Sequence, residues 1–223
     1  DSIYVDEFYE FGSSLNGGTQ FTMKNIEICR NDVNSTNGEG IYIDSFEYFA
    51  YDIDGTSTFS MDSILINSNY IESNSDGMYL GRIKQFGNRM YQNSTASITG
   101  ISIEENMVTS TNGEGIYING FIDFGSVMYD ESIFTIGDIS INGNVIDSRY
   151  TCIYVNQLQY IGYEMFDHSS FSMGNIEVIG NDMTSESDYG IYLYGYDIGY
   201  DLNDASSAHL DGFMINDNQL TAA

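Results

Sequence analysis

The chain contains no proline and no tryptophan among its 223 residues, and only two cysteines, two histidines and six basic side chains. Because proline interrupts the hydrogen-bond ladder of a sheet, its absence suits a chain built of paired strands. Two cysteines are too few for a disulfide scaffold. Six basic residues against 33 acidic ones give a formal charge of −27, which argues against nucleic-acid or anionic-membrane partners. No apolar run approaches the ~18 residues of a membrane-spanning helix, so membrane insertion is not expected.

Apolar residues are plentiful by contrast. Hydrophobic residues make up 42% of the chain and aromatic residues 14%, which is enough to build a core. This composition argues against intrinsic disorder. The length fits one domain of ordinary size, so we predict a single domain over residues 1–223.

An internal repeat of 37 or 38 residues runs through the whole chain. Each copy has alternating apolar residues, as in Ile26-Glu27-Ile28, followed by an asparagine. A second unit, Gly40-Ile41-Tyr42-Ile43 or a close variant, follows in five copies, and Ile3-Tyr4-Val5 opens the chain with the same pattern. Apolar alternation is the period of a strand with one buried face. The repeat therefore predicts a solenoid whose rungs, one per repeat, stack ~4.8 Å apart with equivalent residues in columns.

The repeated asparagine predicts a ladder of side-chain amides at one corner of the solenoid. Each amide would bond its neighbour one rung away, and such a bond contributes ~1 kcal/mol. The ladder would consist of Asn31, Asn69, Asn106, Asn144, Asn181 and Asn218. The same register predicts four ion pairs between adjacent rungs: Lys24 with Asp62, Lys84 with Glu47, Arg89 with Asp52 and Arg149 with Glu186.

A third apolar segment lies between the two units of each repeat. Phe46, Phe49 and Ile53 show its i, i+3, i+7 spacing, which fits either one short amphipathic helix per rung or an irregular strand with bends. We favour the strand, because aromatic residues prefer strands and glycines are poor helix formers. The glycines in this arm are Gly87, Gly125, Gly162 and Gly195.

The Asn-x-Val/Ile and Gly-Ile-Tyr-Ile/Leu units resemble the right-handed parallel β-helix repeats of bacterial and archaeal surface proteins. The resemblance covers essentially the whole chain and implies an all-β parallel β-helix (β-solenoid) of six 37–38-residue rungs with an extended third arm. The alternative is a leucine-rich-repeat-like solenoid, because all six copies match the pattern L-x-x-L-x-L-x-x-N-x-L. The β-helix fold hosts adhesins, lyases, tailspikes and coat proteins, so it does not by itself decide the function.

Catalytic signatures are few. His168 and His209 fall in different columns, and neither cysteine lies in a nucleophile motif. A polysaccharide lyase or hydrolase on a β-helix face is a less favoured reading, because no cluster of arginine or lysine accompanies the carboxylates. We therefore expect that the protein is not an enzyme.

One acidic column is a candidate metal site. Asp130, Asp167 and Asp204 are 37 residues apart and would stack on successive rungs, where their charges repel unless something compensates them. A Ca²⁺ ion or a basic group from a neighbour would do so; the alternative is a row of exposed, solvated carboxylates. No other cofactor is expected.

A column of tyrosines alternates with the inward apolar residues and so points outward. Stacked outward rings would bind glycans or pack against another subunit, unless the third arm covers them. The column consists of Tyr4, Tyr42, Tyr79, Tyr117, Tyr154 and Tyr192.

The two cysteines and two sequons carry the remaining candidate modifications. Cys29 and Cys152 lie three rungs, roughly 14 Å, apart, which excludes an internal disulfide; either they are free or they cross-link neighbouring subunits. Asn34-Ser35-Thr36 and Asn93-Ser94-Thr95 match the N-glycosylation pattern and are expected in turns or loops.

The ends of the chain suggest a function. The 223 residues amount to about six repeats, and neither the first nor the last shows a capping segment. Uncapped rungs with complementary ends give head-to-tail contacts that build rings or filaments. We therefore expect an extracellular, cell-surface structural protein that polymerises with copies of itself, resembling archaeal sheath or surface-layer subunits. The alternative is a glycan-binding adhesin or tailspike-like module.

Overall fold

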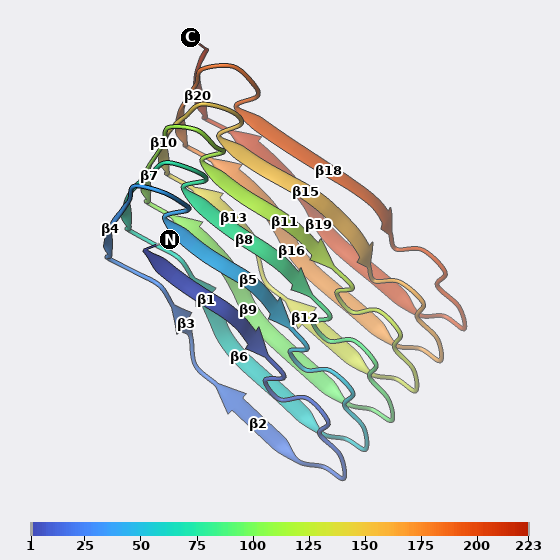
Figure 1. Cartoon of the computed structure of the whole chain (residues 1–223). Coiled ribbons are helices and arrows are strands. Elements are labelled where there is room, and N and C mark those ends of the chain that lie inside the picture. The colour runs from blue at the N-terminus through green and yellow to red at the C-terminus, as the bar shows by residue number, and fades with distance from the viewer. Residues whose placement is uncertain (1, 223) are drawn as a thin grey trace.

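The computed structural model describes residues 2–222 and shows a parallel β-solenoid of about six rungs without a helix in that range (Figure 1). Each rung contributes to three parallel sheets, so the three faces of the solenoid run along its whole length. The predicted all-β solenoid is confirmed. The leucine-rich-repeat alternative is wrong, because the described rungs form three sheets where that fold has one.

Sheet A is built from the Gly-Ile-Tyr-Ile units. Its strands, in spatial order, are β1 (Ile3–Tyr9), β5 (Ile41–Glu47), β8 (Met78–Lys84), β11 (Ile116–Ile122), β15 (Ile153–Ile161) and β18 (Ile191–Ile198). Alternate residues of each strand point inward: Ile41 and Ile43 are buried, whereas Tyr42 between them is partly exposed.

Sheet C follows each ladder asparagine and is short. Its strands are β4 (Asp32–Ser35), β7 (Tyr70–Ser73), β10 (Met107–Ser110), β14 (Val145–Ser148), β17 (Asp182–Ser185) and β20 (Gln219–Ala222).

Sheet B carries the alternating residues that precede each asparagine. Two of its rungs are each divided into two strands, β2 with β3 and β12 with β13. Its strands are β2 (Gln20–Met23), β3 (Ile26–Glu27), β6 (Thr58–Leu65), β9 (Thr95–Glu104), β12 (Ile133–Ile136), β13 (Ile139–Asn142), β16 (Ser170–Ile179) and β19 (Ser207–Asn216).

The register of the strands places equivalent residues of successive repeats side by side. In sheet A, Ile116 pairs with Met78 on one side and with Ile153 on the other. Two of the four predicted ion pairs are present: Lys84 with Glu47 at 3.2 Å and Arg89 with Asp52 at 3.9 Å. The other two, Lys24–Asp62 and Arg149–Glu186, are not formed within residues 2–222. Arg149 instead donates a 2.7 Å hydrogen bond to the Asn112 side chain one rung back, as exposed pairs are too weak to fix one geometry.

The core is a set of inward columns. Its largest fully buried members include Phe46, Phe49, Phe86 and Phe124. The rings of Phe86 and Phe124 stack with centroids 5.0 Å apart. These phenylalanines belong to the third arm, which is the predicted strand with bends and contains no helix. After sheet A it continues as single bridges from rung to rung, such as Met90 to Met128, before entering sheet B.

The bends of each rung use left-handed backbone. The same six positions in every rung have φ between about 51° and 78°, as Tyr48, Ala50, Asp52, Gly55, Thr56 and Ser68 do in the second rung. Proline cannot adopt such φ values, and a non-glycine residue there costs roughly 1–2 kcal/mol. The absence of proline therefore reflects the turns as well as the ladders.

One left-handed column forms slots for aromatic rings. A Cβ added at Gly87 or Gly125 would lie 2.2 Å from the ring of Phe134 or Phe171, respectively, one rung on. This position must therefore be glycine in any rung where a phenylalanine ring of the next rung packs against it. In the second rung the column carries Ala50, and the position that would face it is Ala96 instead of a phenylalanine. Both residues are fully buried, so this exchange keeps the core filled.

Candidate functional site

The asparagine ladder is present as predicted. Each side-chain oxygen accepts hydrogen bonds from the asparagine of the previous rung. Asn144 Oδ1, for example, accepts from the backbone N–H of Asn106 at 3.0 Å and from the Nδ2 of Asn106 at 2.9 Å. The Nδ2 of Asn144 in turn donates to Ile103 O and to Asn181 Oδ1. The four central members, from Asn69 to Asn181, are at most 1% exposed. The ladder is thus structural and fixes one corner of every rung.

The tyrosine column is on the surface, as its alternation predicted. Successive rings stack face to face along the solenoid, with centroids 4.7–5.2 Å apart and planes within 15°. Burial, together with Asp44, raises the pKa of Tyr42 to about 12, so its hydroxyl stays protonated. Because each ring face covers the next, only the ring edges and hydroxyls face outward. A sugar would find no free ring face along this column except at its two ends.

The three predicted metal ligands lie on an exposed edge. Asp130, Asp167 and Asp204 each occupy the first position of a left-handed two-residue turn, and their side chains are exposed. Their backbone carbonyls accept from the turn one rung back; for example, Asp130 O accepts from Asn93 N at 2.7 Å. Within residues 2–222 no three His, Cys, Asp or Glu side chains converge as a metal site. The geometry therefore favours the solvated row over a Ca²⁺ site.

The two cysteines differ in solvent exposure. Cys29 is partly exposed, whereas Cys152 is fully buried in a column that holds Ser2 in the first rung and glycine in the others. At Gly40, Gly77 and Gly115, an added Cβ would meet Ile71, Val108 or Ile146 at 2.1–2.2 Å; the residue in the corresponding position for Cys152 is Met183. Leu220, which is branched at Cγ, would likewise meet a Cβ added at Gly190 at 2.0 Å, whereas methionine has no branch at all, which leaves room for the thiol. An intersubunit disulfide through Cys152 is therefore wrong, and only Cys29 retains that prediction.

The thiols should differ in reactivity. Burial raises the pKa of Cys152, and its sulfur contacts Ser148 and the carbonyl of Thr184, both at 3.3 Å. Since the thiolate is the reactive form, native protein should release one equivalent of thionitrobenzoate from Ellman's reagent, through Cys29. Unfolded protein should release two. Release of two equivalents at the same rate from native protein would contradict this assignment, and Cys29→Ser serves as the control that should release none until it unfolds.

The two sequons lie in different structures. Asn93 is exposed in a two-residue turn, as expected. Asn34 is instead within strand β4, where its Nδ2 donates to Glu72 Oε2 at 3.1 Å, so its predicted place in a turn or loop is wrong. The histidines remain apart: His168 is exposed in a turn, and His209 Nε2 lies 2.8 Å from Asp211 Oδ1.

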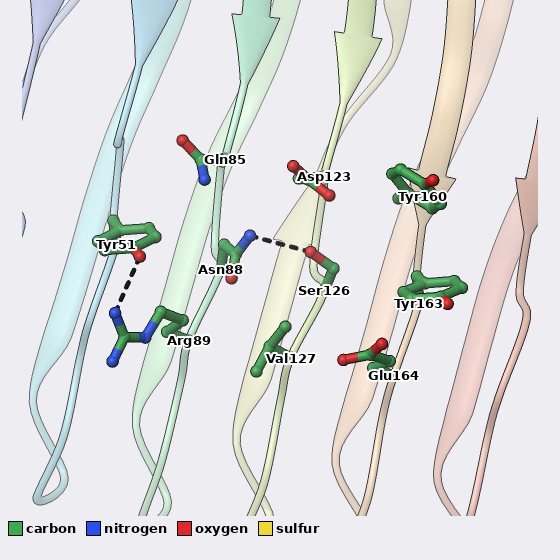
Figure 2. Close-up of a pocket in the computed structure, with 10 residues that line it drawn as sticks. All are labelled: Tyr51, Gln85, Asn88, Arg89, Asp123, Ser126, Val127, Tyr160, Tyr163 and Glu164. Atoms are coloured by element: carbon green, nitrogen blue, oxygen red, sulfur yellow. Dashed lines mark hydrogen bonds between the residues drawn. The ribbon is translucent and has the colours of Figure 1, made fainter.

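A groove in the third arm was missed by the sequence analysis. Tyrosine pairs occupy one corner in the second rung (Tyr48, Tyr51) and in the fifth (Tyr160, Tyr163). The two rungs between them carry smaller polar residues at the same positions: Gln85 with Asn88, and Asp123 with Ser126. The gap leaves an open groove of about 440 Å³, which we call the corner groove (Figure 2). It is lined by Tyr51, Gln85, Asn88, Arg89, Asp123, Ser126, Val127, Tyr160, Tyr163 and Glu164.

The floor of the corner groove is polar and partly unsatisfied. Asn88 is 4% exposed and donates through Nδ2 to Ser126 Oγ at 3.0 Å, but its Oδ1 has no partner. The Oε1 of Gln85 is buried and also lacks a partner. Burial raises the pKa of Asp123, against the opposing effect of Lys84. Comparing each column across rungs, for places where tyrosine is replaced by small polar residues, would have found this groove from the sequence.

The last rung exposes residues that inner rungs bury. Phe213, Ile215 and Leu220 are 49%, 51% and 60% exposed, whereas their equivalents one rung back, Ile176, Val178 and Met183, are at most 3% exposed. Their exposure comes only from the lack of a covering rung.

The fold and these sites define a class, a repeat-built parallel β-solenoid. Comparisons with protein-family models, curated proteins and solved structures found no match to the chain. Within residues 2–222 there is no helix that could cross a membrane.

Proposed function

We propose that this chain is an extracellular structural protein that stacks end to end with copies of itself into a filament, sheath or surface layer. The observation that carries the proposal is the in-register continuation of three parallel sheets and of the inward apolar columns from rung to rung, an arrangement in which a further rung would cover residues such as Phe213, Ile215 and Leu220. Fully burying an exposed side chain of this size contributes ~1.5–3 kcal/mol, and covering the exposed half of each of these would contribute roughly half of that.

The opposite end offers a matching surface. Ile3, Phe8, Phe11, Phe21 and Met23 pack against the core of the first rung but remain partly exposed. The strands β1, β2, β3 and β4 there, and β18, β19 and β20 at the other end, are the edges of parallel sheets. An edge strand has unpaired N–H and C=O groups that another strand can bond. A second copy would continue the apolar columns and the sheets.

The negative charge of the chain implies that stacking would depend on salt or divalent cations. At a formal charge of −27, copies repel one another at low ionic strength, and salt or divalent cations screen that repulsion. Because the carboxylates of residues 2–222 form no converged metal site, divalent cations would act here by screening, which needs the millimolar concentrations typical of extracellular calcium. This supports placing the assembly outside the cell.

A charge placed on the last rung should abolish stacking. Leu220→Lys puts an ammonium group on the proposed interface, yet Leu220 is 60% exposed in the single chain, so folding should be little affected. In sedimentation velocity and negative-stain microscopy, with 0–10 mM Ca²⁺, the unmodified chain should form elongated oligomers and the variant should remain monomeric. Met107→Lys, on the 48% exposed side of β10, is the matched control and should assemble normally. A monomeric unmodified chain at high concentration in all conditions would overturn the proposal.

A further inference from the structure

The corner groove has an aromatic wall with a free face. Tyr163 stacks on Tyr200 of the next rung, with centroids 5.5 Å apart and planes within 10°. The Tyr160 ring of the same rung lies 4.9 Å away at an angle of 57°, and the preceding rung carries Ser126 instead of a ring at the equivalent position, so no ring from that rung covers Tyr163. At the other end, the guanidinium of Arg89 lies over the Tyr51 ring, 5.4 Å from the centroid, and donates to the Tyr51 hydroxyl at 3.0 Å (Figure 2).

The size of the groove fits a small polar molecule. Tyr51 and Tyr163 are three rungs apart, roughly 14 Å along the axis at the usual strand spacing. The volume of about 440 Å³ lies within the ~300–1,000 Å³ range of small-ligand pockets. The groove is open along one side, so a chain-like molecule can enter from there, and a side-chain rotation would bring the buried amide oxygens of Asn88 and Gln85 within its reach.

The polar groups of the groove favour a ligand rich in hydroxyls. The unpaired amide oxygens of Asn88 and Gln85 and the carboxyl groups of Asp123 and Glu164 are acceptors, and Arg89 supplies donors at one end. Exchanging the Oδ1 and Nδ2 positions of Asn88 by an amide flip does not change this conclusion, because only one of the two atoms faces Ser126 Oγ and the other is left without a partner. A buried unpaired polar atom costs about 1–3 kcal/mol, which is recovered when a ligand bonds it.

We propose that the corner groove binds a neutral saccharide. The apolar C–H face of a pyranose would stack on the free face of Tyr163, and its hydroxyls would bond Asn88, Asp123 and Glu164. Anionic sugars are disfavoured by the two carboxyl groups of the groove and by the charge of the chain. An ammonium ion could also lie against the tyrosine rings and carboxyl groups, but it has no acceptor atom for the N–H groups of Arg89, so a saccharide fits the groove better.

Binding should be measured by isothermal titration with neutral hexasaccharides of glucose, mannose, galactose and N-acetylglucosamine. Tyr163→Ala should weaken binding by on the order of tenfold, since it removes the stacking face, whereas Tyr163→Phe should stay within about threefold. Asp123→Tyr should abolish binding because it fills the gap. Tyr48 and Tyr160 hold the equivalent positions one or two rungs away with φ of 61° and 55°, so the fold accepts tyrosine there.

Tyr129→Ala is the matched control. It removes a ring that stacks between Tyr91 and Phe166 away from the groove, and it should bind as the unmodified chain does. Absence of binding to all four hexasaccharides would overturn the proposal. Binding that persists in both Tyr163→Ala and Asp123→Tyr, or binding of tetramethylammonium alone, would also overturn it.

Discussion

Asn144→Ala should destabilise the solenoid by about 3–5 kcal/mol, as measured by urea unfolding. The Asn144 side chain is fully buried and satisfies the carbonyl of Ile103 at 2.9 Å and both amide groups of Asn106. Alanine would leave these groups buried without partners, and each such group costs roughly 1–3 kcal/mol. The side chain of Asn181 would lose one donor as well.

The end of the same ladder provides the control. Asn218 makes the equivalent bonds to Val178 O and Asn181, but it lies on the uncovered last rung, where water can replace them. Asn218→Ala should therefore cost only about 1 kcal/mol. If the two variants lose equal stability, the buried amides are not what stabilises the corner.

Gly125→Ala should destabilise the protein by about 2–4 kcal/mol through a steric clash in the core. The new Cβ would lie 2.2 Å from Phe171 Cδ2 and 2.8 Å from Phe171 Cγ, which are distances that require the ring to move. Gly125 also has φ of 59°, and alanine in this region adds strain. Gly180→Ala isolates the second effect, because Gly180 has φ of 66° and nothing within 4 Å of its added Cβ. It should cost about 1 kcal/mol.

A double variant tests whether the slot and the ring are coupled. Phe171→Ala alone should cost about 3–5 kcal/mol through the cavity it leaves. Combined with Gly125→Ala, it reproduces the Ala50 and Ala96 arrangement of the second rung. The double variant should therefore lose about 1–3 kcal/mol less than the two single losses together. Strictly additive losses would show that the ring and the glycine do not share one space.

The fold was predictable because the repeat converts sequence spacing into spatial distance. Once Asn69 and Asn106 are one rung apart, their contact, the stacking of Tyr79 on Tyr117 and the burial of Ile101 all follow. The strand character of the third arm followed from its glycines and aromatics. These properties depend on equivalent positions in adjacent rungs, so they can be predicted by aligning the repeats and comparing the residues at each position.

Properties that depend on differences within a column were not predicted. Cys152 was expected to be either free or cross-linked to a neighbouring subunit; its burial leaves it free, and this burial depends on the unbranched side chain of Met183. The left-handed positions were not predicted because their columns are mixed: about half hold glycine, aspartate or asparagine, whereas others hold residues such as Tyr48 and Val127 that are not typical of turns. Arg149 took an amide partner one rung back because an exposed side chain has several options of similar energy. In each case the outcome is decided by packing or competition rather than by the repeat itself.

The in-register stacking also makes the length of the molecule adjustable. Each rung hydrogen-bonds only the rung on either side, so duplication of one 37- or 38-residue unit would add ~4.8 Å to the axis and change contacts only at the new junction. A single-residue insertion within a strand would instead turn that strand's inward side chains to the solvent. Insertions and deletions of whole repeats are therefore the changes that the fold tolerates best. The length of the solenoid along its axis changes in steps of one rung.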